Sequence, residues 1–177
     1  MQLLKILTPL AACAVLATAA LPLSAQVAAR APVPGQGDAT LVEMQQAFRK
    51  SDRKQLSLLL PSVRGHALEP WAAYWELRAR LGEASEEEVS AFLQRYAGSY
   101  QEDRLRNDWL LLLGQRRDWG RFAAQHPHYR MADDREVRCY ALAIDVIQGR
   151  APETAAQELR RNWYALRDAD DGCTHAA

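Results

Sequence analysis

The sequence has no excess of charge of either sign, because 22 basic side chains balance 22 acidic ones among 177 residues. A protein that binds nucleic acid through a strong electric field would show clustered Lys and Arg, so this balance argues against a nucleic-acid partner. Apolar residues make up 49% of the chain, which is sufficient for the hydrophobic core of one domain.

Motifs of the common catalytic and cofactor sites are also missing. There is no glycine-rich phosphate loop, no Gly-x-Ser-x-Gly and no His-Glu-x-x-His. Glu76 lies between Trp75 and Leu77, and the acid of a glycosidase needs such an apolar setting, but Glu76 falls off the apolar stripe of its helix and is expected to face solvent. His126 and His128 have no third ligand at helical spacing. We therefore expect no catalytic residue, no cofactor and no metal in this chain.

No segment alternates with period two for long enough to predict a strand, whereas apolar residues recur at helical spacing. The clearest example is residues 105–119, where one apolar stripe is formed by Leu105, Trp109, Leu112 and Leu113. The charged residues around this stripe are expected to face solvent; they are Arg104, Arg106, Asp108, Arg116 and Arg117. Gly114 is a possible helix break, after which Asp118 can cap a following helix.

Further short amphipathic helices are predicted on both sides of this segment. Their expected first-turn residues are Thr40 with Glu43, Ser51 or Asp52, Pro70, Ser85 with Glu88, Asp133 or Asp134, and Pro152. Their expected ends include Gly82, Gly98 and Gly149. The helices pair roughly every thirty residues, which is the length scale of helical repeats.

The predicted fold is therefore all-α, a superhelical array of paired antiparallel helices over residues 40–177. The last clear helix begins at Pro152, and the segment 168–177 that follows it is polar and small. The last pair would then leave an apolar stripe uncovered, formed by Leu159, Trp163 and Leu166.

Residues 1–25 have the pattern of a secretory signal peptide, with Lys5 ahead of an apolar run and small residues at its end. Cleavage is expected near Ala25 or Ala29, and this leader is the only expected membrane contact. The segment Leu10–Cys13 also matches a bacterial lipoprotein box, although only a short apolar core would precede Cys13. Residues 26–39 are rich in Pro and Gly and are predicted to be a flexible linker.

Two of the three cysteines, Cys139 and Cys173, remain after removal of the leader. An even number of cysteines in an exported protein predicts a disulfide between them. No Cys-x-x-Cys is present, which argues against a redox-active pair.

An ordered set of residues spans the chain from about Ala39 to Cys173. Its members are Pro70-Trp71, Tyr74, Leu77, Phe92, Tyr96, Leu105-Arg106-x-x-Trp109-Leu110, Asp118-Trp119, Phe122, Arg138-Cys139-Tyr140, Ala143, Gly149, Trp163 and Cys173. In order and spacing the set resembles the N-terminal helical domain of soluble lytic murein transglycosylases. The resemblance implies a periplasmic α-superhelix that belongs to an enzyme cleaving the glycan strands of peptidoglycan.

In that family a separate lysozyme-like domain carries the catalytic glutamate, and its Glu-Ser and Gly-Leu-Met-Gln motifs are absent from this sequence. The resemblance therefore implies a non-catalytic helical portion, inactive alone, that contacts peptidoglycan. The alternative is a stand-alone periplasmic helical-repeat scaffold that binds a protein or peptide partner.

Overall fold

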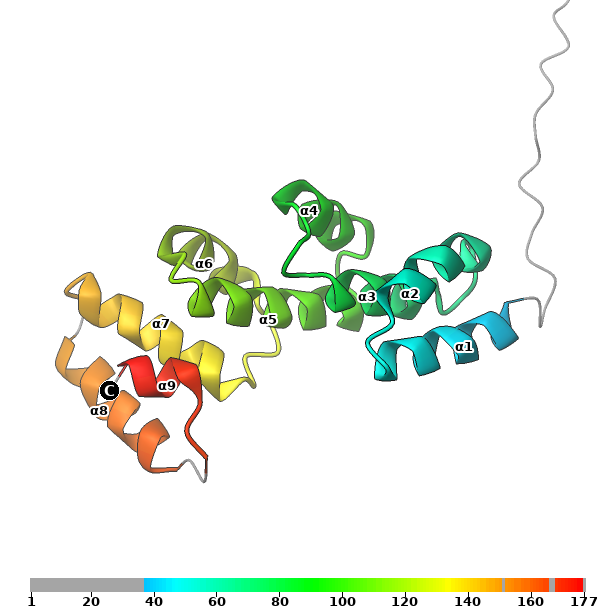
Figure 1. Ribbon diagram of the computed structural model, residues 1–177. Coiled ribbons are helices and arrows are strands. Elements are labelled where there is room, and N and C mark those ends of the chain that lie inside the picture. The colour runs from blue at the N-terminus through cyan, green and yellow to red at the C-terminus, as the bar shows by residue number, and fades with distance from the viewer. Residues whose placement is uncertain (1–36, 151, 166–167, 177) are drawn as a thin grey trace, which may run out of the picture. The chain divides into compact units, whose positions relative to one another are not determined.

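The computed structural model describes residues 37–150, 152–165 and 168–176, and these residues are all-helical, with no strand among them (Figure 1). The α-helices are α1 (Asp38–Arg49), α2 (Arg53–Leu59), α3 (Glu69–Ala79), α4 (Glu86–Arg95), α5 (Tyr100–Gln115), α6 (Trp119–Gln125), α7 (Arg135–Ile147), α8 (Pro152–Tyr164) and α9 (Asp171–Ala176). Two short 3-10 helices are η1 (Leu60–Val63) and η2 (His126–His128). The all-α prediction is confirmed. The predicted signal peptide and all but the end of the predicted linker lie outside the described residues.

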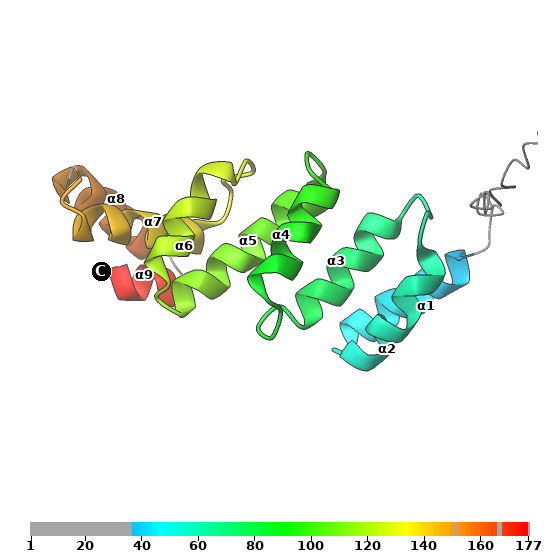
Figure 2. The same ribbon diagram turned by 90° about the horizontal axis from the view of Figure 1, so that it is seen from above.

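Each odd-numbered helix from α1 to α7 contacts the next odd-numbered helix along the chain, and each even-numbered helix contacts at least one odd-numbered neighbour. α1 contacts α2 and α3, α3 contacts α5, and α5 contacts α4, α6 and α7 (Figures 1 and 2). α7 in turn contacts α8 and α9. Within the part of the chain that the structure describes, no helix is both long and apolar enough to cross a membrane.

Most helix starts use the predicted caps. Ser85 and Glu88 form a complete capping box at α4, and the side chains of Asp52, Asp118 and Asp134 accept hydrogen bonds from backbone N–H groups of α2, α6 and α7. The first helix differs from the prediction, because α1 begins at Asp38 after Gly37 and has no side-chain cap. Gly37 has a φ of 113°, a conformation that glycine adopts without steric cost.

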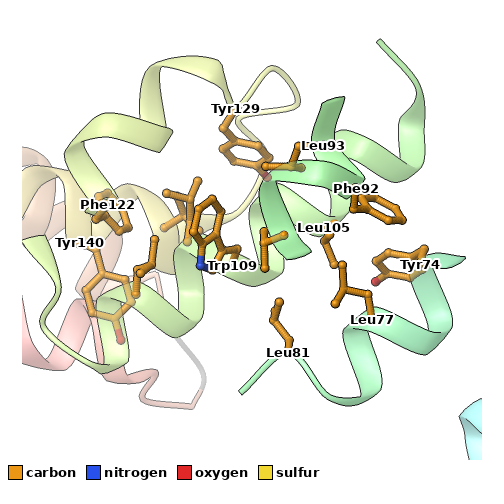
Figure 3. Close-up of a cluster of buried hydrophobic side chains, with 14 of the residues drawn as sticks. Tyr74, Leu77, Leu81, Phe92, Leu93, Leu105, Trp109, Phe122, Tyr129 and Tyr140 are labelled. Atoms are coloured by element: carbon orange, nitrogen blue, oxygen red, sulfur yellow. The ribbon is translucent and has the colours of Figure 1, made fainter. Parts of the chain in front are cut away.

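The main core joins side chains from α3 to α7, and Figure 3 shows them converging on Leu105 and Trp109 of α5. Both residues are buried, as the apolar stripe predicted. A second cluster joins α1, α2, η1 and α3 around Met44 and Leu56, which are fully buried. Burial of this apolar area is the main stabilising contribution to the fold.

Helix α5 departs from the prediction, because its charged face does not lie in water. Arg106 and Asp108 were expected to face solvent, but both are buried, together with Glu102, Asp103 and Asn107. The neighbouring helices and the segment before α7 cover the part of α5 that carries these residues, so helical spacing alone gave the wrong exposure for them. Each charged group has a partner, as burial of charge requires.

The partners of these groups come from distant segments. Asp103 accepts hydrogen bonds from the backbone N–H groups of Arg130 and Met131, at 2.9 and 2.7 Å. Asp108 accepts a hydrogen bond from the hydroxyl of Tyr74, at 2.7 Å, and forms an ion pair with Arg78. Burial, reinforced by the charge of Asp108, raises the pKa of Tyr74 to about 12, so the hydroxyl keeps its proton at neutral pH.

Gly114 was expected as a possible break, but it lies inside α5 and is buried. A Cβ atom at this position would lie 2.4 Å from the ring of Tyr140 on α7. The absent side chain is therefore what lets α5 and α7 approach each other closely.

We expect Gly114→Ala to lower the free energy of unfolding by about 1–3 kcal/mol, because the added methyl group overpacks a buried contact. Urea denaturation followed by circular dichroism measures the change. Gly120→Ala is the matched control: its Cβ would meet nothing within 4 Å, and alanine is the better helix former by about 0.5–1 kcal/mol. Equal stabilities of Gly114→Ala and the wild type would contradict the close approach.

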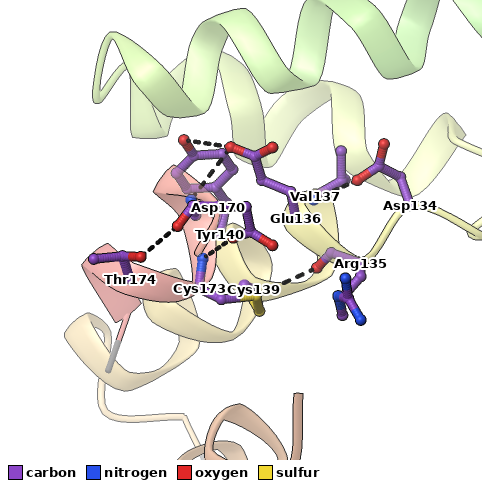
Figure 4. Close-up of a disulfide and its surroundings, with 10 residues drawn as sticks. Asp134, Arg135, Glu136, Val137, Cys139, Tyr140, Asp170, Cys173 and Thr174 are labelled. Atoms are coloured by element: carbon purple, nitrogen blue, oxygen red, sulfur yellow. Dashed lines mark hydrogen bonds between the residues drawn. A yellow bond between two sulfur atoms is a disulfide. The ribbon is translucent and has the colours of Figure 1, made fainter. Parts of the chain in front are cut away.

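The C-terminal helices are held by the predicted disulfide between Cys139 and Cys173, which is confirmed (Figure 4). It joins α7 to α9, a helix that the sequence did not predict. α9 also contacts α5 and α8, Asp171 accepts a hydrogen bond from the hydroxyl of Tyr140, and the backbone N–H of Gly172 donates one to Glu136.

The expectation of an uncovered stripe on α8 is wrong for Leu159, which is buried against the two cysteines. Trp163 is half-buried beside the same cluster. The third member, Leu166, lies outside the described residues. α9 covers this apolar stripe of α8.

We expect Cys139→Ser combined with Cys173→Ser to lower the stability by about 3–4 kcal/mol, the entropic value for a bridge that spans 34 residues. Thermal denaturation of the protein with and without a reducing agent measures the same difference. The double variant should not respond to the reducing agent. Peptide mapping that finds both thiols free in the native protein would contradict the disulfide.

Candidate functional site

A cleft of about 300 Å³ lies between α3 and α4, beside η1. Its walls carry both apolar and charged side chains, namely Leu60, Arg64, Glu69, Ala73, Glu76, Leu77, Arg80, Glu88, Ala91, Phe92, Arg95 and Tyr96. A second hollow of about 460 Å³ lies between α4, α5 and η2. The cleft between α3 and α4 is the stronger candidate, because its walls include the aromatic rings of Phe92 and Tyr96.

One face of α3 forms the floor of the cleft. Residues 69, 73, 76, 77 and 80 recur at the spacing of a single helix face. Ala73 and Leu77 are the buried apolar members of this face, and Phe92 of α4 packs in the same core. The floor is therefore apolar, while charged side chains stand at its two ends.

Glu69 occupies the end of the cleft nearest η1. Its carboxylate accepts hydrogen bonds from Arg95 at 2.6 Å, from the hydroxyl of Tyr96 at 2.9 Å and from the backbone N–H of Gly65 at 2.6 Å. Burial alone would raise the pKa of Glu69, but these hydrogen bonds and the charge of Arg95 outweigh burial and lower it. Arg64 lies at the same end, is exposed, and forms no ion pair among the residues that the structure describes.

Glu76 occupies the other end, and the expectation that it faces solvent is wrong, since only 7% of it is exposed. Its carboxylate accepts hydrogen bonds from Arg80 at 2.7 Å and from the hydroxyl of Ser57 at 2.8 Å. Arg80 also donates a hydrogen bond to Glu88, at 2.6 Å. These bonds to Glu76 and Glu88 raise the pKa of Arg80, although burial opposes them.

The surroundings of Glu76 do not suit a general acid. A glycosidase acid is kept protonated by an apolar pocket, whereas Glu76 is held by a guanidinium group and a hydroxyl. The cleft thus offers an apolar floor and fixed charges, which suit binding and orientation of a ligand rather than proton transfer.

The two histidines considered as metal ligands lie apart from this cleft. His126 is half-buried and stacks on Phe122, with ring centroids 5.6 Å apart, and burial lowers its pKa. His128 is exposed. Among residues 37–150, 152–165 and 168–176, no group of three His, Cys, Asp or Glu side chains could hold a metal ion.

Sequence reasoning missed most of the charged residues of the cleft. Glu69 and Arg95 are 26 positions apart, so no local pattern connects them. The pair Glu76 and Arg80 has i,i+4 spacing, which is a pattern that could have been found.

No family model, no curated protein and no solved structure matches this chain. The resemblance to lytic transglycosylases therefore stays a prediction, based on the ordered residues between Pro70 and Cys173. The geometry of the cleft is observed in the structure and does not depend on that resemblance.

We expect Glu76→Gln to lower the free energy of unfolding by about 1–3 kcal/mol, because Arg80 loses a charged partner in a buried position. Urea denaturation measures the loss. Glu153→Gln is the control, since Glu153 is exposed on α8, and it should leave the midpoint nearly unchanged. A wild-type midpoint for Glu76→Gln would show that the buried ion pair contributes nothing to stability.

Proposed function

We propose that this chain is the non-catalytic helical portion of a lytic murein transglycosylase and acts in the periplasm during cleavage of peptidoglycan glycan strands. The observation that carries the proposal is that the residues of the resemblance, although scattered along the sequence, share one core. Eight of them belong to a single buried cluster: Tyr74, Leu77, Phe92, Leu105, Trp109, Leu110, Phe122 and Tyr140. A set that packs together supports a common helical framework better than isolated matches would.

The order of helix contacts supports the predicted superhelical array. Contacts of α1 with α3, of α3 with α5 and of α5 with α7 are those expected when helix pairs stack on one another. In such an array each pair buries its apolar stripe on the next pair, and an extended surface is left for binding.

Two features support a periplasmic location. The predicted leader directs export, and the disulfide between Cys139 and Cys173 is of a kind that persists in oxidising compartments. Both cysteines are fully buried, which fits a structural bridge.

The proposed role is positioning rather than chemistry. The buried carboxylates of the described helices are engaged by arginines, backbone N–H groups or hydroxyls, as at Glu76, Glu102, Asp103 and Asp108. They stabilise the fold, and the catalytic acid is expected on a separate lysozyme-like domain.

The alternative, a stand-alone periplasmic scaffold for a protein or peptide partner, is favoured by one specific observation. The cleft between α3 and α4 combines an apolar floor with charged ends, which is the usual composition of a ligand-binding site.

We expect the purified chain to release no 1,6-anhydro-muropeptides from peptidoglycan sacculi, because the catalytic acid lies outside it. Chromatography with mass spectrometry of the soluble fraction measures the products, and lysozyme serves as the positive control for substrate quality. Anhydro products released by the chain alone would overturn the assignment as non-catalytic.

The DNA sequence that follows codon 177 distinguishes the two proposed functions. An in-frame or frameshifted continuation beyond codon 177 that encodes Glu-Ser and Gly-Leu-Met-Gln motifs would support the transglycosylase portion. A continuation without them would favour the stand-alone scaffold.

A further inference from the structure

The cleft between α3 and α4 has two ends of opposite net charge. At the end nearest η1, the positive charges of Arg64 and Arg95 exceed the single negative charge of Glu69. At the other end, Arg80 faces two carboxylates, those of Glu76 and Glu88, so one negative charge is left over. A ligand in the cleft therefore meets one unbalanced charge of each sign.

The separation of these ends can be read from α3. Glu69 and Glu76 are seven residues apart on this helix, and Glu88 and Arg95 are seven residues apart on α4, so the backbone positions at the two ends of the cleft lie about 10 Å apart at the helical rise. An extended chain of three residues spans about 10 Å as well. The spacing of the two ends along the helices thus matches the length of a very short peptide.

The groups that carry the unbalanced charges are accessible. Arg64 is exposed and has no ion pair in the described part of the chain, and the side chain of Arg95 is 62% exposed. Glu88 is 46% exposed, and its carboxylate has lone pairs beyond those used by Arg80 and the backbone of Ser85. Between them the floor of Ala73, Leu77 and Phe92 offers only apolar contact.

We propose that this cleft binds a short zwitterionic peptide, with its carboxylate at Arg64 and Arg95, its ammonium group at Glu88, and an apolar side chain over Leu77 and Phe92. A simple anion or cation would satisfy only one end and face the opposite charge at the other. A purely apolar ligand would leave both ends unpaired. The proposal does not depend on the transglycosylase assignment.

The probe is the tripeptide Ala-Leu-Ala, whose termini are both charged at neutral pH, together with its N-acetyl and its C-amide forms. Binding to the full mature chain is followed in the millimolar range by NMR shifts of Leu77 methyl and Phe92 backbone signals. The free tripeptide should bind about threefold to fivefold more tightly than either blocked form, as expected for partly exposed charge pairs. Equal affinities of the three peptides, or no shift of the floor residues, would overturn the proposal.

Three variants assign each terminus to its end of the cleft. Arg64→Gln should remove the preference for a free carboxylate and keep the preference for a free amine. Glu88→Gln should do the reverse, and it preserves the capping box, because glutamine also serves at that position. Arg161→Gln is the control, an exposed arginine of α8 with no ion pair within the described residues, and it should bind like the wild type. Loss of both preferences in one variant, or of neither, would contradict the proposed orientation.

Discussion

The fold depends on how α5 satisfies its buried charges. This helix is enclosed by its neighbours, yet it carries Glu102, Asp103, Arg106 and Asp108 into the interior. A buried charge without a partner would cost several kcal/mol, so each one must be met by a group from another segment. The result is that α3 is bound through Tyr74 and Arg78, and the segment before α7 is bound through the backbone of Arg130 and Met131. These hydrogen bonds and ion pairs thus fix the positions of α3 and of the segment before α7 relative to α5, which apolar packing alone would not determine.

In the cleft between α3 and α4 the buried carboxylates are also paired with other groups, but the pairs lie at the surface of the protein. Glu69 and Glu76 are also held by arginines, but their partners reach them from the surface rather than from the core. The carboxylates are therefore fixed in place and largely buried, whereas the guanidinium groups of Arg80 and Arg95 remain partly open to solvent. Such an arrangement costs little reorganisation when a ligand arrives, because the side chains are already oriented.

Much of the helical architecture could be predicted from the sequence, and particular residues show why. Ser85 with Glu88, Asp118 and Asp134 cap helices through bonds that reach only three residues ahead, so local sequence determines them. The disulfide followed from the count of cysteines and the predicted compartment. Apolar spacing likewise placed Leu105 and Trp109 in the core.

The errors in exposure arise from helix–helix packing, which buries a charged side chain whether its partner is distant or lies one turn away, as Arg80 does from Glu76 and Glu102 from Arg106. Arg106, Asp108 and Glu76 were placed in solvent because periodicity treats a charged side chain as exposed unless its partner is visible. The partners that Asp108 finds in Tyr74 and Arg78 lie about thirty positions away. α9 was missed because a helix of six residues has too few turns to show a pattern, and tertiary contacts stabilise it.

The position of α9 has a consequence for biosynthesis. Tyr140 is fully buried in the finished protein, but the bridge that fixes part of its cover joins residues 34 positions apart. A chain in which α7 is free to fold but α9 is not therefore presents an aromatic side chain whose cover is not yet in place. Earlier helices can pack as they emerge, whereas this region must wait for Cys173 and for an oxidant.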